Sequence, residues 1–153
     1  MLTLQRLQTF GLLEFYSVEN AADATAMAPL FQSSISAGFP SPADDYVELK
    51  IDLNCYLVKN PAATFYVRVK GNSMENAGIY DGDILVVDRA IAPAYNSIAI
   101  CVIAGEFTVK RIGKIGGKLH LLAENPDYPP IAIADDSDFE IWGVVAYIIH
   151  KAN

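Results

Sequence analysis

The chain has 153 residues, and its 52% hydrophobic content excludes a disordered polypeptide and suffices for one domain that folds without a disulfide or metal. Its 11 Lys and Arg stand against 18 Asp and Glu, which gives a formal net charge of -7. Because affinity for a phosphate backbone is built from Lys and Arg, this balance argues against direct binding of nucleic acid.

The cysteine content is low, with only Cys55 and Cys101, and their spacing matches neither C-x-x-C nor a zinc site. This usage fits a reducing cytosol rather than a secreted, disulfide-bonded domain. The longest apolar stretch, residues 141–149, falls far short of the roughly 20 residues that a membrane-spanning helix needs. We therefore expect a cytoplasmic chain with no metal, no cofactor and no membrane segment.

The first 45 residues differ in composition from the rest of the chain. Apolar side chains recur at helical spacing at Leu4, Leu7, Phe10 and Leu13, which predicts one short amphipathic helix. Ala, Ser, Pro and Asn crowd residues 20–43, a composition typical of a flexible arm. The segment offers no second helix to build a DNA-reading head. We expect an N-terminal arm over residues 1–45 and a β-rich domain over residues 46–153.

From residue 47 onward the pattern is that of short strands. Apolar and polar side chains alternate over residues 47–53, which predicts a half-buried strand. A brief helix capped by Asp52 or Asn54 should follow and end before Pro61. Further strands are predicted over residues 64–69, 84–88, 97–103, 106–115, 118–123, 131–134 and 139–150. Turn residues such as Gly116-Gly117 separate them, so the pattern predicts a mostly antiparallel β fold.

Ser73 is the first candidate for chemistry. It follows the end of a predicted strand, where successive backbone N–H groups are unpaired and can form an oxyanion site. The simpler interpretation is that Ser73 caps a short helix. A serine nucleophile also requires a base, because its hydroxyl is a weak nucleophile at neutral pH.

The candidate bases are two histidines and a lysine. The surroundings of His120 and His150 favour ordinary strand histidines. Lys110 lies within a predicted strand, and its burial is left open by the alternation of its neighbours. A desolvated lysine has a lowered pKa and can act as a general base, whereas a solvated strand lysine cannot.

Three segments occur in the order and approximate spacing of the LexA/UmuD family of self-cleaving serine-lysine proteins. They are GNSM at residues 71–74, DGDILVVD at 81–88 and GEFTVKR at 105–111. Residues 38–48, 51–54 and 139–145 resemble the UmuD branch in particular, so that the resemblance covers about residues 29 to 150. It implies a mostly β catalytic domain with Ser73 as nucleophile and Lys110 as general base. It also implies an oxyanion site made by the backbone N–H groups of Ser73 and Met74.

The resemblance implies that the substrate is the protein's own arm, and the position that matches the scissile bond is Ala37-Gly38. Small residues there allow the backbone to approach Ser73 Oγ to roughly 3 to 3.5 Å. The family often has Asp at the position of Asn72, and UmuD-type sites often have Cys at the position of Ala37. Neither difference removes an atom that the reaction requires.

The resemblance also implies partners. They are a second copy of the chain in a homodimer, a RecA-type recombinase filament on single-stranded DNA that triggers cleavage, and a Y-family, UmuC-like polymerase subunit that joins the trimmed form for error-prone translesion synthesis in the SOS response. The sliding clamp is a further expected partner. Two alternatives stay open: a non-cleaving regulatory or scaffold module for a polymerase, and a LexA-like repressor fragment without its DNA-binding head. A signal-peptidase-like enzyme also uses serine and lysine, but it works at a membrane and this sequence shows no anchor.

Overall fold

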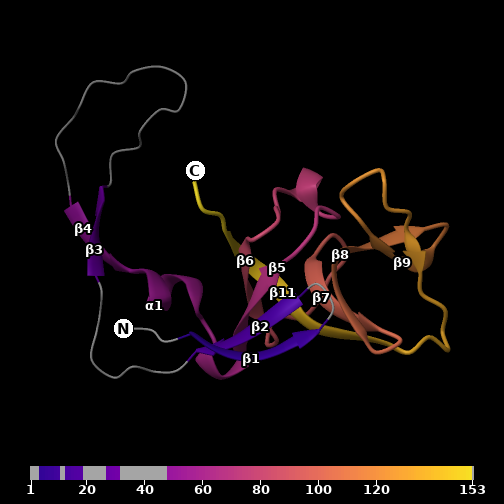
Figure 1. Ribbon diagram of the computed structural model, residues 1–153, viewed down its shortest axis with the longest axis horizontal. Helices are drawn as coiled ribbons and strands as arrows, with labels where there is room; N and C mark the ends of the chain where they lie inside the picture. Colours follow the sequence, from indigo (N-terminus) through magenta and orange to yellow (C-terminus); the bar gives the residue numbers. More distant parts are fainter. Residues whose placement is uncertain (1–3, 11–12, 19–26, 32–47, 153) are drawn as a thin grey trace, which may run out of the picture.

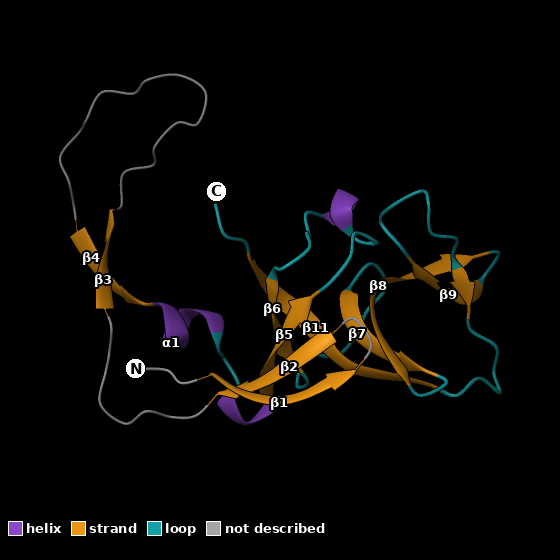
Figure 2. Ribbon diagram, viewed as in Figure 1, coloured by secondary structure: helices purple, strands orange, loops and turns teal. Residues whose placement is uncertain are grey.

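The structure is a computed structural model that describes residues 4–10, 13–18, 27–31 and 48–152 (Figure 1). Strands dominate it, as Figure 2 shows. The strands are β1 (Leu4–Phe10), β2 (Leu13–Val18), β3 (Met27–Phe31), β4 (Glu48–Asp52), β5 (Thr64–Val69), β6 (Ile84–Asp88), β7 (Ile98–Ile103), β8 (Glu106–Ile115), β9 (Lys118–Leu122), β10 (Ile131–Ala132) and β11 (Phe139–Ile149). The helical segments are α1 (Leu53–Leu57) and the 3-10 turns η1 (Pro61–Ala63) and η2 (Glu75–Ala77). The predicted mostly β fold is confirmed.

Within the described residues, nine strands form one antiparallel sheet in the order β1-β2-β5-β6-β11-β7-β8-β9-β10. The sheet curls, which brings strands that are distant in its order around a common interior (Figure 1). β3 and β4 pair with each other in a separate two-stranded sheet, which lies beyond α1 and away from the main sheet (Figure 1). Among the described residues β4 pairs with β3 alone, and Leu49 is 47% exposed where the sequence predicted a half-buried strand, while Ile51 on the same face is half-buried.

Local sequence signals account for several of these elements. Asp52 caps α1 as predicted, because its carboxylate accepts hydrogen bonds from the backbone N–H groups of Asn54 and Cys55. The Gly116-Gly117 turn between β8 and β9 has φ angles of 58° and 80°. Two positive φ angles in succession are what a tight hairpin turn requires, and glycine adopts them without steric cost.

The predicted amphipathic helix near the N-terminus is wrong. Residues 4–10 and 13–18 form the antiparallel strands β1 and β2, and β2 pairs with β5. A helix of about ten residues is marginal in water without tertiary packing, and Gly11 within it would weaken it further. The strand conformation instead satisfies the free backbone groups along the edge of β5, so the tertiary partner outweighs the helical spacing of the leucines.

The main hydrophobic core lies between the curled strands and contains direct chain neighbours of both Ser73 and Lys110. Its buried members are Leu13, Val67, Val69, Met74, Ile79, Leu85, Val87, Ile100 and Val109. Met74 follows Ser73 in the chain, and Val109 precedes Lys110. The core therefore anchors the immediate neighbours of both candidate residues, which restricts how far either backbone can move.

Candidate functional site

Ser73 lies in the turn that connects β5 to η2. Gly71 opens this turn with a φ of 90°, and its N–H donates a 2.7 Å hydrogen bond to the Asp81 carboxylate. Two residues later Ser73 is half-buried, while Met74 is inserted into the core. The turn thus presents the serine hydroxyl at the surface of the core rather than in open solvent.

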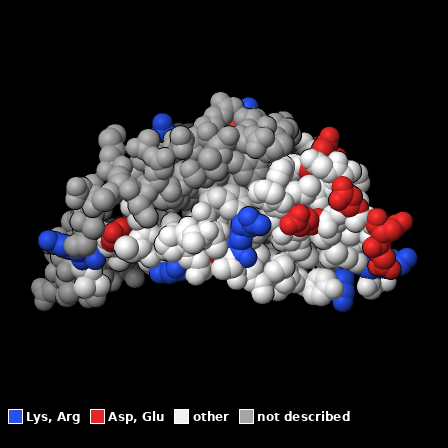
Figure 3. Space-filling view, turned by 90° about the horizontal axis from the view of Figure 1, so that it is seen from below, with Lys and Arg blue, Asp and Glu red and all other residues white. Residues whose placement is uncertain are grey.

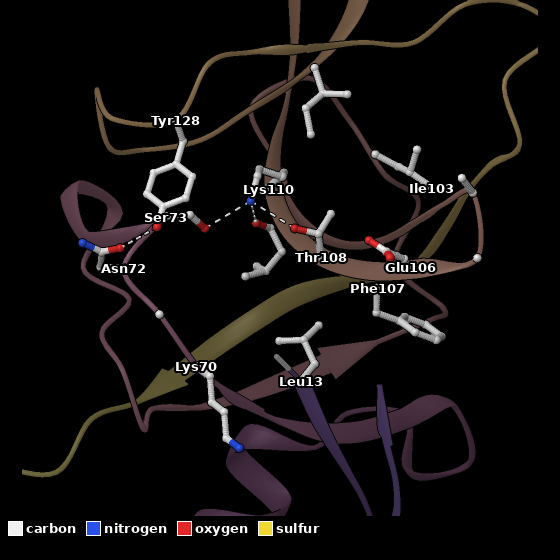
Figure 4. Close-up of a pocket in the computed structure, with 15 residues that line it drawn as sticks. Leu13, Lys70, Asn72, Ser73, Ile103, Glu106, Phe107, Thr108, Lys110 and Tyr128 are labelled. Atoms are coloured by element: carbon white, nitrogen blue, oxygen red, sulfur yellow. Dashed lines mark hydrogen bonds between the residues drawn. The ribbon is translucent and has the colours of Figure 1, made fainter. Parts of the chain in front are cut away.

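Lys110 lies in the middle of β8, opposite Ala99 of β7, and it is only 7% exposed. Its Nζ lies 3.1 Å from Ser73 Oγ, 3.0 Å from Thr108 Oγ1 and 3.0 Å from the Val109 carbonyl oxygen (Figure 4). The curl of the sheet therefore brings together two residues that are 37 positions apart in the sequence. The alternative of a solvated strand lysine is wrong.

The surroundings of Lys110 favour its neutral form. Burial lowers the pKa of the Lys110 ammonium, because the charged form loses its hydration. A thiolate at Cys101 would oppose this effect, but burial raises the pKa of the Cys101 thiol to about 12. Near neutral pH the thiol is protonated and supplies no counter-charge.

A neutral lysine amine has two N–H donors and one lone pair, and three partners surround Nζ. The two N–H groups can donate to Thr108 Oγ1 and to the Val109 carbonyl oxygen, both of which can accept a hydrogen bond. The lone pair then points at Ser73, whose hydroxyl can donate to it across 3.1 Å. In this state the geometry is that of a base ready to remove the serine proton.

The backbone near Ser73 also offers hydrogen-bond donors. Among the residues that the structure describes, no hydrogen bond is donated by the backbone N–H of Ser73 or of Met74. Free N–H groups beside a nucleophile are the feature that an oxyanion site requires. Their role as that site stays a prediction.

A loop between β9 and β10 holds the Ser73 turn in place, and sequence reasoning did not identify it. The backbone N–H of Glu124 donates to the Ser73 carbonyl oxygen at 2.9 Å. The Asn125 side-chain amide donates to the Asn72 carbonyl oxygen at 3.0 Å. The Tyr128 hydroxyl donates to Asn72 Oδ1 at 2.8 Å, as Figure 4 shows. These partners lie more than 50 residues from Asn72 in the sequence, so no local signal pointed to them.

Ser73 and Lys110 lie in the wall of a cleft. The lining includes the apolar side chains of Leu13 and Phe107 and the polar side chains of Lys70 and Glu106 (Figure 4). A cleft with both apolar and polar walls can take an extended peptide whose side chains enter it while its backbone passes the hydroxyl. Ala37 and Gly38, the predicted scissile pair, lie outside the described residues.

The two histidines lie elsewhere. His120, in β9, contacts the carbonyl oxygen of Lys118 through Nδ1 at 2.9 Å. His150 follows β11, and its Nδ1 lies 2.6 Å from Oδ1 of the buried Asp83. Neither histidine lines the cleft, so neither is placed to serve Ser73.

No set of three His, Cys, Asp or Glu side chains within the described ranges is arranged to hold a metal ion. In the same ranges, no helix has both the length and the apolar character needed to cross a membrane. In the view of Figure 3, acidic side chains gather toward the end of the molecule where β9 lies, while Lys and Arg are scattered. The described residues on that face form no continuous basic stripe of the kind that tracks a phosphate backbone.

A curled antiparallel sheet that holds a buried lysine beside a serine is compatible with a serine peptidase-type fold. The comparisons with known proteins agree with this class. The Peptidase S24-like family matches residues 29–146, and the chain belongs to this family. The resemblance to the LexA/UmuD group that the sequence motifs indicated is thereby confirmed.

Individual relatives cover most of the chain. Protein SamA of Salmonella typhimurium strain LT2 is 47% identical over 124 residues, which are 81% of this chain and 86% of that protein. Protein ImpA of Escherichia coli is 43% identical over 139 residues, 86% of this chain and 89% of that protein. The LexA repressor of Bordetella parapertussis is 35% identical over 115 residues, 75% of this chain but only 53% of the repressor.

Proposed function

We propose that the protein is an autocatalytic serine endopeptidase that cuts its own chain between Ala37 and Gly38. The observation that carries the proposal is the 3.1 Å approach of Lys110 Nζ to Ser73 Oγ at a buried site where the lysine pKa is lowered. The division into a segment 1–45 that holds the cleavage bond and a catalytic domain over 46–153 belongs to the same proposal.

In the first half of the reaction, neutral Lys110 removes the proton of Ser73 as Oγ attacks the carbonyl carbon of Ala37. The carbonyl oxygen becomes an oxyanion, which the N–H groups of Ser73 and Met74 stabilise. When the Ala37-Gly38 bond breaks, the Lys110 ammonium returns its proton to the amine of Gly38. An ester between Ser73 and Ala37 remains.

In the second half, water attacks this ester while Lys110 again acts as the base. The ester bond breaks, Ser73 regains its proton, and Ala37 leaves as a carboxylate. The products are a peptide that ends at Ala37 and a fragment that begins at Gly38. Water and two side chains complete the balance, so the reaction requires neither metal nor cofactor.

The family supports a proposal for the biological setting. We propose that the chain acts in the cytoplasm as a homodimer in SOS mutagenesis, and that a RecA-type filament on single-stranded DNA stimulates the cut. The trimmed form then joins a Y-family, UmuC-like polymerase subunit in translesion synthesis, with the sliding clamp as a further partner. The formal net charge of -7 supports contacts with proteins rather than with nucleic acid.

The test is the intact mass of the purified protein over time, with and without a recombinase filament on single-stranded DNA. We expect a new species that begins at Gly38, formed faster with the filament and absent from Ser73→Ala. A folded wild-type chain that stays intact in every condition would refute self-cleavage. It would favour the alternative of a regulatory or scaffold module for a polymerase.

A further inference from the structure

The N-terminal strands are built into the main sheet although they precede the proposed cleavage bond. β2 pairs antiparallel with β5 in the register Leu13 with Val69, Glu14 with Arg68, Phe15 with Val67 and Tyr16 with Tyr66. β1 pairs with the other side of β2 and forms the outer edge of the sheet. In Figure 1 these two indigo strands lie across the sheet beside β5, not apart from it.

Side-chain contacts reinforce this pairing at the end nearest the site. Leu13 is only 3% exposed and belongs to the same core cluster as Val69 and Met74. The Glu14 carboxylate lies 3.7 Å from Arg68 Nε and 3.8 Å from Lys70 Nζ. β2 is therefore held by ladder hydrogen bonds, by an apolar anchor and by two ion pairs.

The same strand shapes the cleft. Leu13 lines its wall together with Lys70 and Phe107, across the cleft from Lys110 (Figure 4). A cut between Ala37 and Gly38 severs the covalent connection of β1 and β2 to the catalytic residues. It breaks none of the contacts described above, because they join residues 13–16 to residues 66–74, and the cut lies between these two groups in the sequence.

We propose that the N-terminal product stays bound after cleavage as a noncovalent subunit, with the β1-β2 hairpin as the edge of the catalytic sheet. This inference rests on the proposed function for the position of the cut. Strand addition to a sheet edge is an established mode of peptide binding, in which backbone hydrogen bonds supply affinity and side-chain pockets supply register. Here Leu13 is the side chain that packs into the core beside Val69 and Met74. The cleaved protein therefore keeps the part of the cleft wall that Leu13 forms.

The experiment uses two different cuts. The first is self-cleavage of the wild-type chain at alkaline pH. The second is made in a Ser73→Ala chain, in which residues 19–26, between β2 and β3, are replaced by the recognition sequence of a site-specific protease. Denaturing mass spectrometry establishes each cut, and size exclusion with native mass spectrometry then reports whether the N-terminal fragment remains with the rest.

After each of the two cuts, we expect the N-terminal fragment to stay bound to the rest of the chain at a one-to-one ratio. Release of the short fragment from a folded remainder after the second cut would overturn the proposal. The second cut also separates the two hypotheses: a wild-type chain that never cuts itself refutes the proposed function, while retention of the hairpin is still measured. After the second cut, β3 lies in the longer fragment together with its partner β4. The pairing of β3 with β4 therefore cannot hold the short fragment in place.

Matched variants locate the contacts responsible. In the second-cut chain, Glu14→Lys replaces two attractive ion pairs by repulsion without touching the core, and we expect the fragment to dissociate roughly tenfold faster. Leu13→Asp should abolish retention by placing a charge in the core. The control Lys50→Glu changes an exposed charge on β4, outside this contact, and should leave retention unchanged. Equal dissociation rates for Glu14→Lys and the unmodified fragment would show that β2 is not the attachment.

Discussion

Thr108 offers a sharp test of how the lysine is held. Its hydroxyl oxygen accepts a hydrogen bond from Lys110 Nζ at 3.0 Å, and Thr108→Val removes this acceptor while keeping the shape of the side chain. The net contribution of one such bond is about 0.5 to 1.5 kcal/mol. Since about 1.4 kcal/mol corresponds to a tenfold change in rate, we expect self-cleavage to slow roughly 2- to 12-fold.

The assay is the first-order loss of intact chain, followed by mass spectrometry at a fixed alkaline pH. Thr108→Ser is the matched control, because it keeps the hydroxyl and should retain most of the wild-type rate. The unfolding midpoint of each variant establishes that the fold is intact. A Thr108→Val chain that cuts as fast as wild type would refute the idea that this hydroxyl orients the amine.

Three further predictions follow from other contacts. Lys110→Met should raise the free energy of unfolding relative to wild type at neutral pH, and the difference should shrink as the pH approaches 10.5, the ordinary pKa of lysine. The reason is that the lowered pKa of Lys110 destabilises the folded state only while the lysine of the unfolded chain is protonated. Gly143→Ala should destabilise by about 1 to 3 kcal/mol in chemical denaturation, because the added Cβ would lie 2.7 Å from Val87 Cγ1 in the core. Tyr128→Phe should slow cleavage up to about tenfold without lowering the melting temperature, because it removes only the hydrogen bond to Asn72 Oδ1.

Each of these has a contradicting outcome. A pH-independent difference between Lys110→Met and wild type would mean that folding does not lower the pKa of Lys110. Ala146→Val adds methyl groups at an exposed position of the same strand, and equal stability losses for it and for Gly143→Ala would argue against the steric explanation. A melting temperature that falls in parallel with the Tyr128→Phe cleavage rate would assign that hydroxyl a structural role alone.

Much of the fold could be predicted because its signals are local. Short apolar runs with turn residues between them located β5, β6 and β8. The glycine pair at 116–117 located a hairpin through its conformational freedom. The sequence motifs also selected Ser73 and Lys110, and the structure brings these two side chains within hydrogen-bond distance.

What could not be predicted depends on distant partners. The spacing of Leu4, Leu7 and Phe10 suits a helix as well as a strand pair, and only the free edge of β5 decides between them. Likewise, Asn125 and Tyr128 reach Asn72 because the sheet curls, which no spacing in the sequence encodes. The burial of Lys110 was open for the same reason, since its neighbours in β8 alternate without indicating which face the curled sheet encloses.

The central claim is that a neutral Lys110 is the base that activates Ser73, and the rate of self-cleavage as a function of pH tests it most directly. Because burial places the pKa of Lys110 below its ordinary value of 10.5, the rate should rise about tenfold per pH unit and level off before that value. Lys110→Ala should form no product beginning at Gly38 at any pH. A flat profile, or a Lys110→Ala chain that cuts the same bond at the wild-type rate, would contradict the account.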